Sequence, residues 1–290
     1  MGSPHAASVP SPSNSVVRKN IYKSPKDLKG MLAPGILTAR ALDAVRESIA
    51  PGITTLELDQ IAESVIRQGG GEPNFALVPG YRHTICSSVN DEVVHGIPTG
   101  RVLEAGDIVS IDCGALLDGW NGDSAITVVI PDPARPELVA ERQRLSDVTE
   151  RSLWHGIAAL ARAKHLNEVG AAIEDYIDSQ GTFGILEDYV GHGIGRSMHE
   201  APTVFNYAVR DKGPAVKPGL CVAIEPMVTL GGIDTFVHDD EWTISTEDGT
   251  DAAHWEHSVV VHAEGIWVTT AHDGGAAALK PLGVTPVPIP

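Results

Sequence analysis

The chain of 290 residues has few cysteines and few aromatic residues, and it lacks any long apolar run. Its three cysteines, Cys86, Cys113 and Cys221, lie in strand-like contexts without a regular spacing, so we expect no disulfide framework but reduced, buried thiols in a cytoplasmic protein. The absence of a long apolar run excludes a membrane-spanning helix. The residues after Met1 contain no apolar core of an export signal. The length allows one large domain with a substantial core.

Positive charge is also scarce. The sequence has 21 Lys and Arg residues against 38 Asp and Glu residues, which gives a formal net charge of -17. Direct nucleic-acid binding is therefore not expected, because the composition offers nothing that neutralises phosphates in bulk. The main basic cluster runs from Arg18 to Lys23, at the end of a Pro/Ser-rich start.

Five residues stand out because each is an ionisable side chain set inside or against an apolar, strand-like run: Asp112, Asp123, His192, Glu225 and Glu256. Carboxylates are rarely buried unless they are paired or bound to a cation, since the loss of hydration is costly. Four carboxylates and one imidazole form an oxygen-rich ligand set. Such a set suits a pair of divalent ions such as Mn, Fe, Co or Zn better than a tetrahedral structural zinc.

A predicted hairpin places the first two acids. Residues 107–130 read as two strands joined by Asp118-Gly119, a strong signal for a two-residue turn. If these two residues form the turn, Asp112 pairs with Ala125, and Asp123 lies one diagonal step away on the same face. Diagonal neighbours are roughly 7–8 Å apart, so both carboxylates could reach shared ions. The alternative is that both are exposed turn aspartates.

The other two acids repeat this pattern. Glu225 ends an apolar strand over residues 219–225, and Pro226 then removes a backbone donor, so we expect the strand to bend or bulge there and aim the side chain into a site. Glu256 stands just before the β-branched run of residues 259–261. A single acid of this kind could be accidental, but four form a pattern.

Most of the twelve histidines are expected to be ordinary surface or helix residues, and this interpretation applies to His5, His155, His165, His238, His262 and His272. His192 differs because the flanking glycines, Gly191 and Gly193, would let a metal or substrate approach the backbone closely. His95 and His199 are further candidates, since loops often carry functional residues. Each could equally be an ordinary loop residue, although His-Gly-Ile occurs at both His95 and His192.

Two stretches of the chain look like an internal duplication. Residues 57–70 are echoed by residues 168–181, and residues 106–112 are echoed by residues 219–225 at nearly the same offset. The identities are few. They suggest an α+β core with two-fold-like symmetry, in which each half gives a helix pair and an apolar strand that ends in an acid, and a metal site lies at the seam between the halves.

Helical apolar spacing predicts four main helices, over residues 37–49, 56–66, 136–163 and 166–177. Pro34-Gly35 interrupts what would otherwise be one long first helix, so we expect a kink or a restart there. Pro51-Gly52 then separates the first helix from the second.

Six motifs in order, between about Lys26 and Thr270, together resemble type I methionine aminopeptidases: Val94-His95-Gly96-Ile97-Pro98, Ile111-Asp112 with Gly122-Asp123, Gly191-His192-Gly193-Ile194-Gly195, Met198-His199-Glu200, Ile224-Glu225-Pro226-Met227 and Glu256-His257-Ser258-Val259-Val260-Val261. Any one alone would be weak, but their combination is specific. The resemblance implies the pita-bread (creatinase/aminopeptidase) fold, a curved antiparallel sheet backed by helices. It implies removal of the initiator methionine from nascent proteins whose second residue is small.

The resemblance also implies a role for each site residue. Asp112 and Asp123 would be ligands on the hairpin, with Asp123 bridging two divalent ions, which could be Co, Mn, Fe, Zn or Ni. His192 would complete the shell of one ion, Glu225 would bind that ion and shuttle the proton, and Glu256 would bridge. A metal-bridged hydroxide would attack the scissile carbonyl. His95 and His199 would contact the scissile amide from the substrate side.

The pocket for the methionine side chain follows from the same resemblance. Its implied walls are Tyr81, Cys86, Met198 and Trp242, which form an apolar slot suited to a thioether. Met198 stands where the family commonly has an aromatic residue, and residues 75–80 depart from the usual Tyr-containing stretch. These departures concern fine selectivity and not the reaction. The alternative for each wall residue is ordinary core packing.

These observations divide the chain into three parts. Residues 1–25 would be a flexible arm, which by similarity to longer-armed relatives either lies across the domain or touches the ribosome, with a solvated tail as the alternative. Residues 26–272 would form the catalytic domain. Residues 273–290 would be a mobile Gly/Ala/Pro-rich tail. The expected partners are nascent polypeptide N-termini, with no membrane partner and a monomeric state.

Two other functions stay open. The first is an X-Pro aminopeptidase or prolidase of the same fold, which shares the five ligands but usually carries an extra folded amino-terminal domain. Only the short arm of residues 1–25 precedes the helices here. The second is a non-catalytic binding module on the same fold. Such modules typically lose metal ligands, whereas this chain keeps all five.

Overall fold

The computed structural model describes residues 20–290, in which runs of helices and runs of strands follow one another in an α+β arrangement. The helices are α1 (Pro25–Gly30), α2 (Leu32–Ser48), α3 (Thr55–Gln68), α4 (Pro136–Leu160), α5 (Glu168–Gln180) and α6 (Ala276–Leu279), with 3-10 turns η1 (Phe75–Leu77) and η2 (Lys280–Leu282). The strands are β1 (Glu72–Pro73), β2 (Ile85–Val89), β3 (Glu92–Val94), β4 (Ile108–Leu117), β5 (Trp120–Val129), β6 (Gly184–Ile185), β7 (Gly191–Gly193), β8 (Glu200–Val204), β9 (Cys221–Ile224), β10 (Met227–Thr229), β11 (Thr235–Val237), β12 (Ile244–Thr246), β13 (Ala252–His254), β14 (His257–His262) and β15 (Gly265–Val268).

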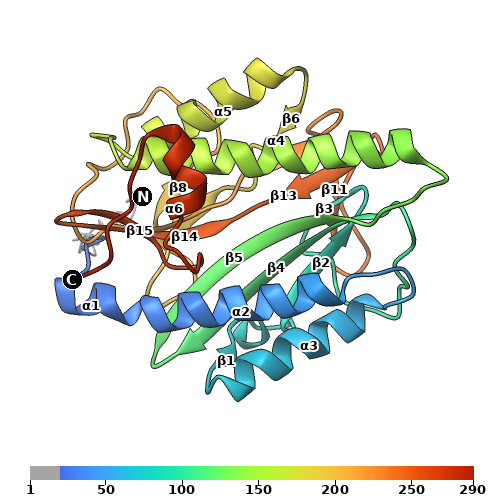
Figure 1. Cartoon of the computed structure of the whole chain (residues 1–290), viewed down its shortest axis with the longest axis horizontal. Helices are drawn as coiled ribbons and strands as arrows, with labels where there is room; N and C mark the ends of the chain where they lie inside the picture. Colours follow the sequence, from blue (N-terminus) through green and yellow to red (C-terminus); the bar gives the residue numbers. More distant parts are fainter. Residues whose placement is uncertain (1–19) are drawn as a thin grey trace, which may run out of the picture.

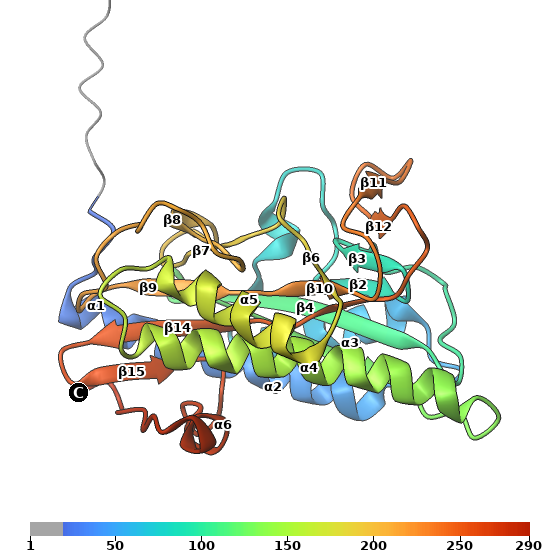
Figure 2. The ribbon, with the colours of Figure 1, turned by 90° about the horizontal axis from the view of Figure 1, so that it is seen from above.

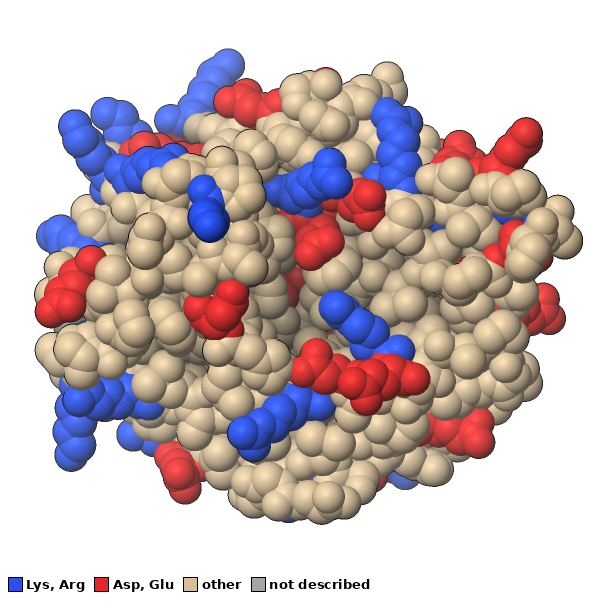
Figure 3. All heavy atoms as spheres, in the orientation of Figure 1, with Lys and Arg blue, Asp and Glu red and all other residues tan. Residues whose placement is uncertain are grey.

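Long helices cover one side of the sheets. Figure 1 shows α4 running above and α2 below, with the strands behind and between them. In Figure 2 the same helices lie on one side of the molecule, while β7, β8, β11 and β12 lie toward the other. Acidic and basic side chains are spread over the helix-covered face around a central hollow (Figure 3). The helices thus leave the opposite face of the sheets for a site.

The strand pairings between these elements are antiparallel. One sheet has the order β1-β4-β2, with β5 paired to β4, and a five-stranded sheet has the order β15-β14-β9-β7-β8. Two three-stranded sheets, β13-β10-β6 and β11-β12-β3, complete the arrangement. The α+β class predicted from the sequence is therefore observed.

The β4–β5 hairpin has the predicted register. Asp118 and Gly119 form the turn with positive φ angles of 53° and 72°, which favour Asp and Gly at these positions. Leu117 pairs with Trp120 and Asp112 pairs with Ala125. The turn sequence alone therefore fixed which residues share a face, because a slip by one residue would have moved every side chain to the other face.

The two halves of the molecule are joined at a short seam. The Ala125 N–H donates to the Glu256 carbonyl at 3.3 Å, and the Glu256 N–H donates to the Ala125 carbonyl at 3.0 Å. This exchange ties β5 to the segment between β13 and β14. The Ser258 hydroxyl adds a bond of 2.8 Å to the Asp123 carbonyl. The internal echoes predicted a seam between two halves, and these bonds form a junction between them; the metal site at the seam stays a prediction.

The predicted main helices are present as α2, α3, α4 and α5. In α3, the Thr54 side chain accepts from the Glu57 N–H at 3.2 Å and the Glu57 carboxylate accepts from the Thr54 N–H at 2.8 Å, a capping box. Leu58 and Ile66 on its inner face are fully buried. The restart expected at Pro34-Gly35 lies a few residues earlier, between α1 and α2, because proline is tolerated in the first turn of a helix.

Both ends of the described chain lie on the domain. Near the start, the Lys23 N–H donates to the Gly219 carbonyl at 2.7 Å, and the Tyr22 hydroxyl donates to the Ala215 carbonyl at 2.7 Å. The end of the predicted flexible arm is thus held in place. Its residues 1–19, including Arg18 and Lys19, lie outside the described residues, so the ribosome contact stays a prediction.

The C-terminal segment differs from the expected mobile tail. Leu279 in α6 is fully buried and Val284 is 8% exposed, and both belong to the main hydrophobic core. The His262 Nε2 contacts the Val287 carbonyl oxygen at 2.7 Å. The Gly/Ala/Pro composition suggested mobility, but the few large apolar side chains are spaced so that they reach the core.

Two further expectations concern the membrane and the cysteines. Along residues 20–290, no helix combines the length and the apolar character needed to cross a membrane. Cys86, Cys113 and Cys221 are free and buried. The expected reduced thiols are therefore observed.

Candidate metal centre and active site

The five predicted ligands come from separate parts of the sequence and line one cavity of about 220 Å³. Asp112 and Asp123 lie on β4 and β5, His192 on β7, Glu225 directly after β9, and Glu256 directly before β14. Four of them are buried, with exposed fractions of 3% for Asp123, 8% for His192, 9% for Glu225 and 2% for Glu256. Asp112 is partly open to the cavity.

Glu225 and Glu256 occupy matching breaks in two neighbouring chain segments. Pro226 interrupts the run between β9 and β10, and the chain changes sheet there, because β9 pairs with β14 whereas β10 pairs with β13. Opposite this break, Trp255 and Glu256 separate β13 from β14. The bend predicted at Pro226 is therefore present, and it turns the Glu225 side chain into the cavity.

The glycines beside His192 serve the backbone. A Cβ atom on Gly191 would lie 2.4 Å from the Ala223 carbonyl oxygen, and one on Gly193 would lie 2.2 Å from the Ala201 carbonyl oxygen. Such distances are shorter than real Cβ contacts, so neither position can carry a side chain without a shift of the backbone. The glycines therefore allow β7 to pack closely between β8 and β9, whereas the sequence suggested room for a metal or substrate.

One hydrogen bond sets the protonation of His192. Its Nδ1 lies 3.0 Å from the Gly193 carbonyl oxygen, which can only accept, so Nδ1 carries the proton. The Nε2 atom therefore presents a lone pair to the cavity, 3.4 Å from the Glu225 Oε1 and 4.0 Å from the Asp123 Oδ2. Burial lowers the pKa of His192 to about 4, so the ring is neutral at pH 7. A lone pair that faces carboxylate oxygens is favourable only with a cation between them.

The carboxylates show the same need for a cation. Asp112 Oδ1, Asp123 Oδ1 and Glu256 Oε1 are buried and have no hydrogen-bond partner within residues 20–290. Burial raises the pKa of Asp112 to about 7. Burial, followed by the charges of neighbouring carboxylates, raises the pKa of Asp123 and Glu256 well above the usual range. Carboxylates crowded in a low-dielectric cavity are stabilised as anions by a bound divalent ion.

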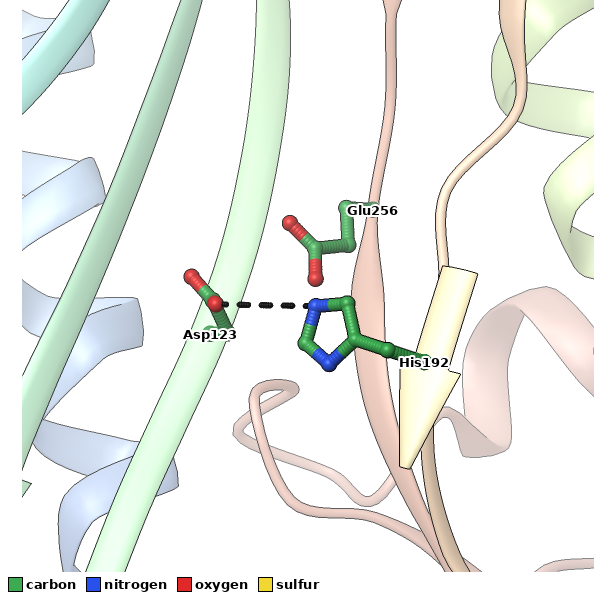
Figure 4. A group of neighbouring side chains, drawn as sticks. All are labelled: Asp123, His192 and Glu256. Atoms are coloured by element: carbon green, nitrogen blue, oxygen red, sulfur yellow. Dashed lines mark ion pairs between the residues drawn. The ribbon is translucent and has the colours of Figure 1, made fainter. Parts of the chain in front are cut away.

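The closest cluster of possible ligand atoms contains Asp123, His192 and Glu256. One ligand atom from each of these residues lies within 4.8 Å of the others. Figure 4 shows the three side chains, from β5, β7 and the start of β14, pointing toward one another. The oxygen-rich set with one imidazole fits a hard or borderline divalent ion.

The predicted substrate-side residues line the same cavity. Tyr81, Cys86, Met198 and Trp242 form its apolar part, and the Tyr81 and Trp242 rings meet edge to face at 5.0 Å. The Tyr81 hydroxyl donates to the Ile85 carbonyl at 2.7 Å, which fixes this ring. These four residues come from three segments that are distant in the sequence, and only the structure brings the segments together.

The two candidate histidines, His95 and His199, line the same cavity as the predicted metal ligands. The rings of His199 and His192 have centroids 4.2 Å apart, and His199 is exposed to the cavity mouth. Dehydration lowers the pKa of His199, and dehydration followed by the charge of His199 lowers the pKa of His95. Both rings are neutral at pH 7 and can each donate one N–H. His95 adopts a positive φ of 60°, an uncommon backbone conformation that marks a constrained position.

Comparison with known protein families and proteins agrees with this geometry. The model of "Metallopeptidase family M24" matches residues 29–263. The chain belongs to this family. Methionine aminopeptidase 1 of Mycobacterium tuberculosis is 47% identical over 254 residues, which cover 86% of this chain and 94% of that protein. Methionine aminopeptidase 1 of Bacillus subtilis is 40% identical over 250 residues, with 86% and 98% covered.

Solved structures of methionine aminopeptidases are also similar to this M24 chain. Methionine aminopeptidase from Rickettsia prowazekii has a TM-score of 0.81 at 33% identity and covers 86% of this chain and 99% of its own. Prolidase from Pyrococcus furiosus has a TM-score of 0.66 at 19% identity, with 87% and 65% covered, a likeness of fold alone. The predicted pita-bread fold and the predicted resemblance to type I methionine aminopeptidases, which are metallo-exopeptidases, are confirmed.

The sequence interpretation missed some residues of the M24 site. Phe75, Val78 and Val94 also line the cavity. His254 is 1% exposed, and its Nε2 lies 3.7 Å from the Glu225 Oε2. A signal for His254 was available, since it stands two residues before Glu256 in the same segment. His254 was not singled out because the chain has twelve histidines and most were expected to be ordinary residues.

Proposed function

We propose that this M24 metallopeptidase removes an N-terminal methionine from polypeptides whose second residue is small. The observation that carries the proposal is the position of unpartnered, buried carboxylate oxygens directly beside an apolar slot. A site of this kind combines a cation-binding end with a pocket for one apolar side chain, as an aminopeptidase requires.

The ligand assignment follows the orientation of the side chains. Asp112, Asp123, His192 Nε2, Glu225 and Glu256 would hold two divalent ions. Co, Mn, Fe, Zn and Ni are all compatible with this donor set. The bound ions would supply Lewis-acid polarisation of a carbonyl oxygen and an acidified water molecule. The buried, unpartnered oxygens of Asp112, Asp123 and Glu256 support this assignment.

The protein side chains would do the remaining work. Glu225 is buried with a raised pKa, first through burial and then through the charge of Asp112, so its carboxylate is suited to accept a proton and pass it to the leaving amine. His199 and His95, as neutral imidazoles, would each donate a hydrogen bond to the scissile amide. Donation to the developing oxyanion is worth more than donation to the ground-state carbonyl.

The apolar part of the cavity would bind the first side chain of the substrate. Phe75, Tyr81, Cys86, Met198 and Trp242 present aromatic and sulfur-containing surfaces that suit a flexible thioether. His95 and His199 line the same cavity as this slot, and we propose that they face the second residue of the substrate. We therefore propose that these two histidines restrict the size of the second side chain.

A peptide series tests the proposal. Initial rates would be measured on Met-X-Ser peptides at a fixed concentration of Mn or Co. We expect Met-Ala, Met-Gly and Met-Ser to be cleaved, whereas Met-Lys, Met-Leu and Met-Phe are poor because a large side chain must displace the histidines. Norleucine should replace the first methionine, because an apolar pocket distinguishes such near-isosteres by only about 1–3 kcal/mol.

The same series contains the rival outcomes. A preference for proline at the second position, whatever the first residue, would instead identify an X-Pro peptidase. Rapid cleavage of Met-Lys and Met-Phe would contradict the steric restriction. The absence of turnover with every metal, in protein that still binds metal by calorimetry, would favour a non-catalytic module.

The proposed substrates in the cell are nascent polypeptides, so we also propose that the protein acts in the cytoplasm as a monomer. The basic residues of the amino-terminal arm are proposed to touch the ribosome. Co-sedimentation with ribosomes, compared between the full chain and a variant that lacks residues 1–19, tests this contact. Equal sedimentation of the two would contradict it.

A further inference from the structure

We infer that His254 is a positioning residue that donates a hydrogen bond from Nε2 to Glu225 and so fixes which oxygen of this carboxylate faces the cation. The inference rests on the proposed function. His254 lies on β13 behind the metal cluster and is not among the residues that line the cavity. It therefore acts through Glu225 and does not itself touch the substrate.

The geometry around Glu225 places one imidazole at each carboxylate oxygen. Oε1 lies 3.4 Å from the His192 Nε2, which carries a lone pair. Oε2 lies 3.7 Å from the His254 Nε2. The rings of His192 and His254 both turn their Nε2 atom toward the Glu225 carboxylate. If both rings were metal ligands, one of them would be redundant. A lone pair on one side and an N–H on the other side instead orient the group, with Oε1 toward the cation and Oε2 toward a donor.

The Nε2 atom of His254 is buried and has no hydrogen-bond partner among the described residues. The buried His192 and His262 each hold a carbonyl oxygen, that of Gly193 and that of Val287. A buried polar atom without a partner destabilises a fold. The distance of 3.7 Å from the His254 Nε2 to the Glu225 Oε2 exceeds the usual hydrogen-bond length. We therefore expect this distance to shorten to a hydrogen bond when the site binds its metal ions.

Hydrogen bonds of the His254 backbone hold the residue in place, so its ring nitrogens are not needed to position the side chain. The His254 N–H donates to the Ser110 and Thr127 hydroxyl oxygens, each at 3.1 Å, and the His254 carbonyl accepts from the Thr127 hydroxyl at 2.7 Å. On the other side, His254 pairs with Met227 of β10, two residues beyond Glu225. Both Glu225 and His254 are thus placed by adjacent, paired strands.

Replacement of the ring tests the donor role. In His254→Gln a side-chain N–H donor remains, whereas His254→Leu and His254→Met remove it and keep a similar volume. We expect the apolar variants to lower kcat on Met-Ala-Ser at least tenfold with KM changed less than twofold, and to weaken metal binding measured by calorimetry. We expect His254→Gln to keep at least a third of the wild-type kcat and the wild-type metal affinity.

A matched control separates this role from ordinary packing. His262 is also a buried histidine, but it lies away from the cavity and bonds the C-terminal segment. His262→Leu should lower the thermal unfolding midpoint and leave kcat and metal affinity unchanged. If His254→Gln loses as much activity as His254→Leu, or if the apolar variants keep wild-type kcat and metal affinity, the inference is wrong.

A measurement on the unaltered protein removes any dependence on variant folding. In ¹⁵N-histidine-labelled protein loaded with Zn, the proton of His254 should reside on Nε2 and give a slowly exchanging, downfield resonance, assigned by its loss in His254→Gln. A proton on Nδ1 would overturn the inference. Failure of Met-Ala-Ser cleavage by the wild-type protein would overturn the proposed function instead, and the tautomer and the metal affinities would still be measured.

Discussion

At the scale of single residues, the site depends on acids carried into the interior by apolar strands. Asp123 is 3% exposed, and its Oδ1 has no partner among the described residues. Its neighbours on β5, Ser124 and Ala125, are instead bonded to the Glu256 segment. The chain is thus tied down directly after Asp123, and the Asp123 side chain is left for a cation.

The first prediction concerns this carboxylate. Asp123→Asn is nearly isosteric, so the fold should persist, but metal content and turnover should both fall to near background because a neutral amide cannot balance two cations. Metal content would be measured after purification and compared with Met-Ala-Ser turnover. Asp118→Asn, the same chemical change at the exposed turn of the same hairpin, should be neutral. Unchanged metal stoichiometry with near-normal turnover in the Asp123 variant would contradict the shared-ligand assignment.

The second prediction concerns His199, which lies beside His192 at the cavity mouth. His199→Ala should keep normal metal content while kcat falls by about 10²–10³, the usual effect of losing one oxyanion donor. Metal analysis and steady-state rates on one preparation check this. Loss of metal from the variant would show instead that His199 is a ligand.

At the scale of elements, the site depends on how closely α2 approaches the β4–β5 hairpin. A Cβ atom on Gly122 would lie 2.7 Å from the backbone of Pro34 and Gly35 in α2. The Thr38 hydroxyl also donates to the Gly122 carbonyl at 3.2 Å. This contact fixes the position of β5 one residue before Asp123. A glycine is required here by close approach, and its φ is not positive.

The third prediction follows from this contact. Gly122→Ala should lower the free energy of unfolding by about 1–3 kcal/mol, the usual cost of overpacking, because backbone atoms cannot move aside as a side chain can. It should also weaken metal binding through the shift of Asp123. Urea unfolding of the metal-free protein and metal calorimetry are the measurements. Gly100→Ala is the control, since a Cβ there meets open space; an equal effect of both substitutions would contradict the packing argument.

At the scale of the whole molecule, the C-terminal segment closes the core beside α4. Leu279 and Val284 belong to the same hydrophobic core as β4, β9 and β14, and Arg162 donates to the Leu282 and Gly283 carbonyls at 2.7 and 2.9 Å. Figure 2 shows α6 on the same side of the molecule as α2 and α4. No residue of this segment lines the cavity that contains the predicted metal ligands. Its contribution should therefore be to stability and not to chemistry.

The fourth prediction tests this separation. Leu279→Ala should lower the free energy of unfolding by about 2–5 kcal/mol, as for other fully buried leucines. Turnover of Met-Ala-Ser well below the unfolding midpoint should stay within twofold of wild type. Urea unfolding and steady-state rates check the two parts, with the exposed Lys280→Ala as the neutral control. An unchanged midpoint for Leu279→Ala would show that the segment is a dispensable tail, as its composition suggested.

The sequence by itself determined the features that rest on local rules. Asp118-Gly119 set the hairpin register, Thr54 and Glu57 set the start of α3, and Pro226 set the break beside Glu225. Burial of charged side chains in apolar strands identified the five candidate ligands before any contact was known, because such residues are too costly to keep without a cation.

Only the tertiary structure decided what depends on contacts between distant segments. It showed that the glycines beside His192 serve strand packing, that the C-terminal segment reaches the core, and that His254 faces Glu225. It also set the His192 tautomer through the Gly193 carbonyl. The physical reason is common to all of these. Local preferences fix which side chains share a face, but close approach, burial and the partner of a ring nitrogen exist only after separate strands have been brought together.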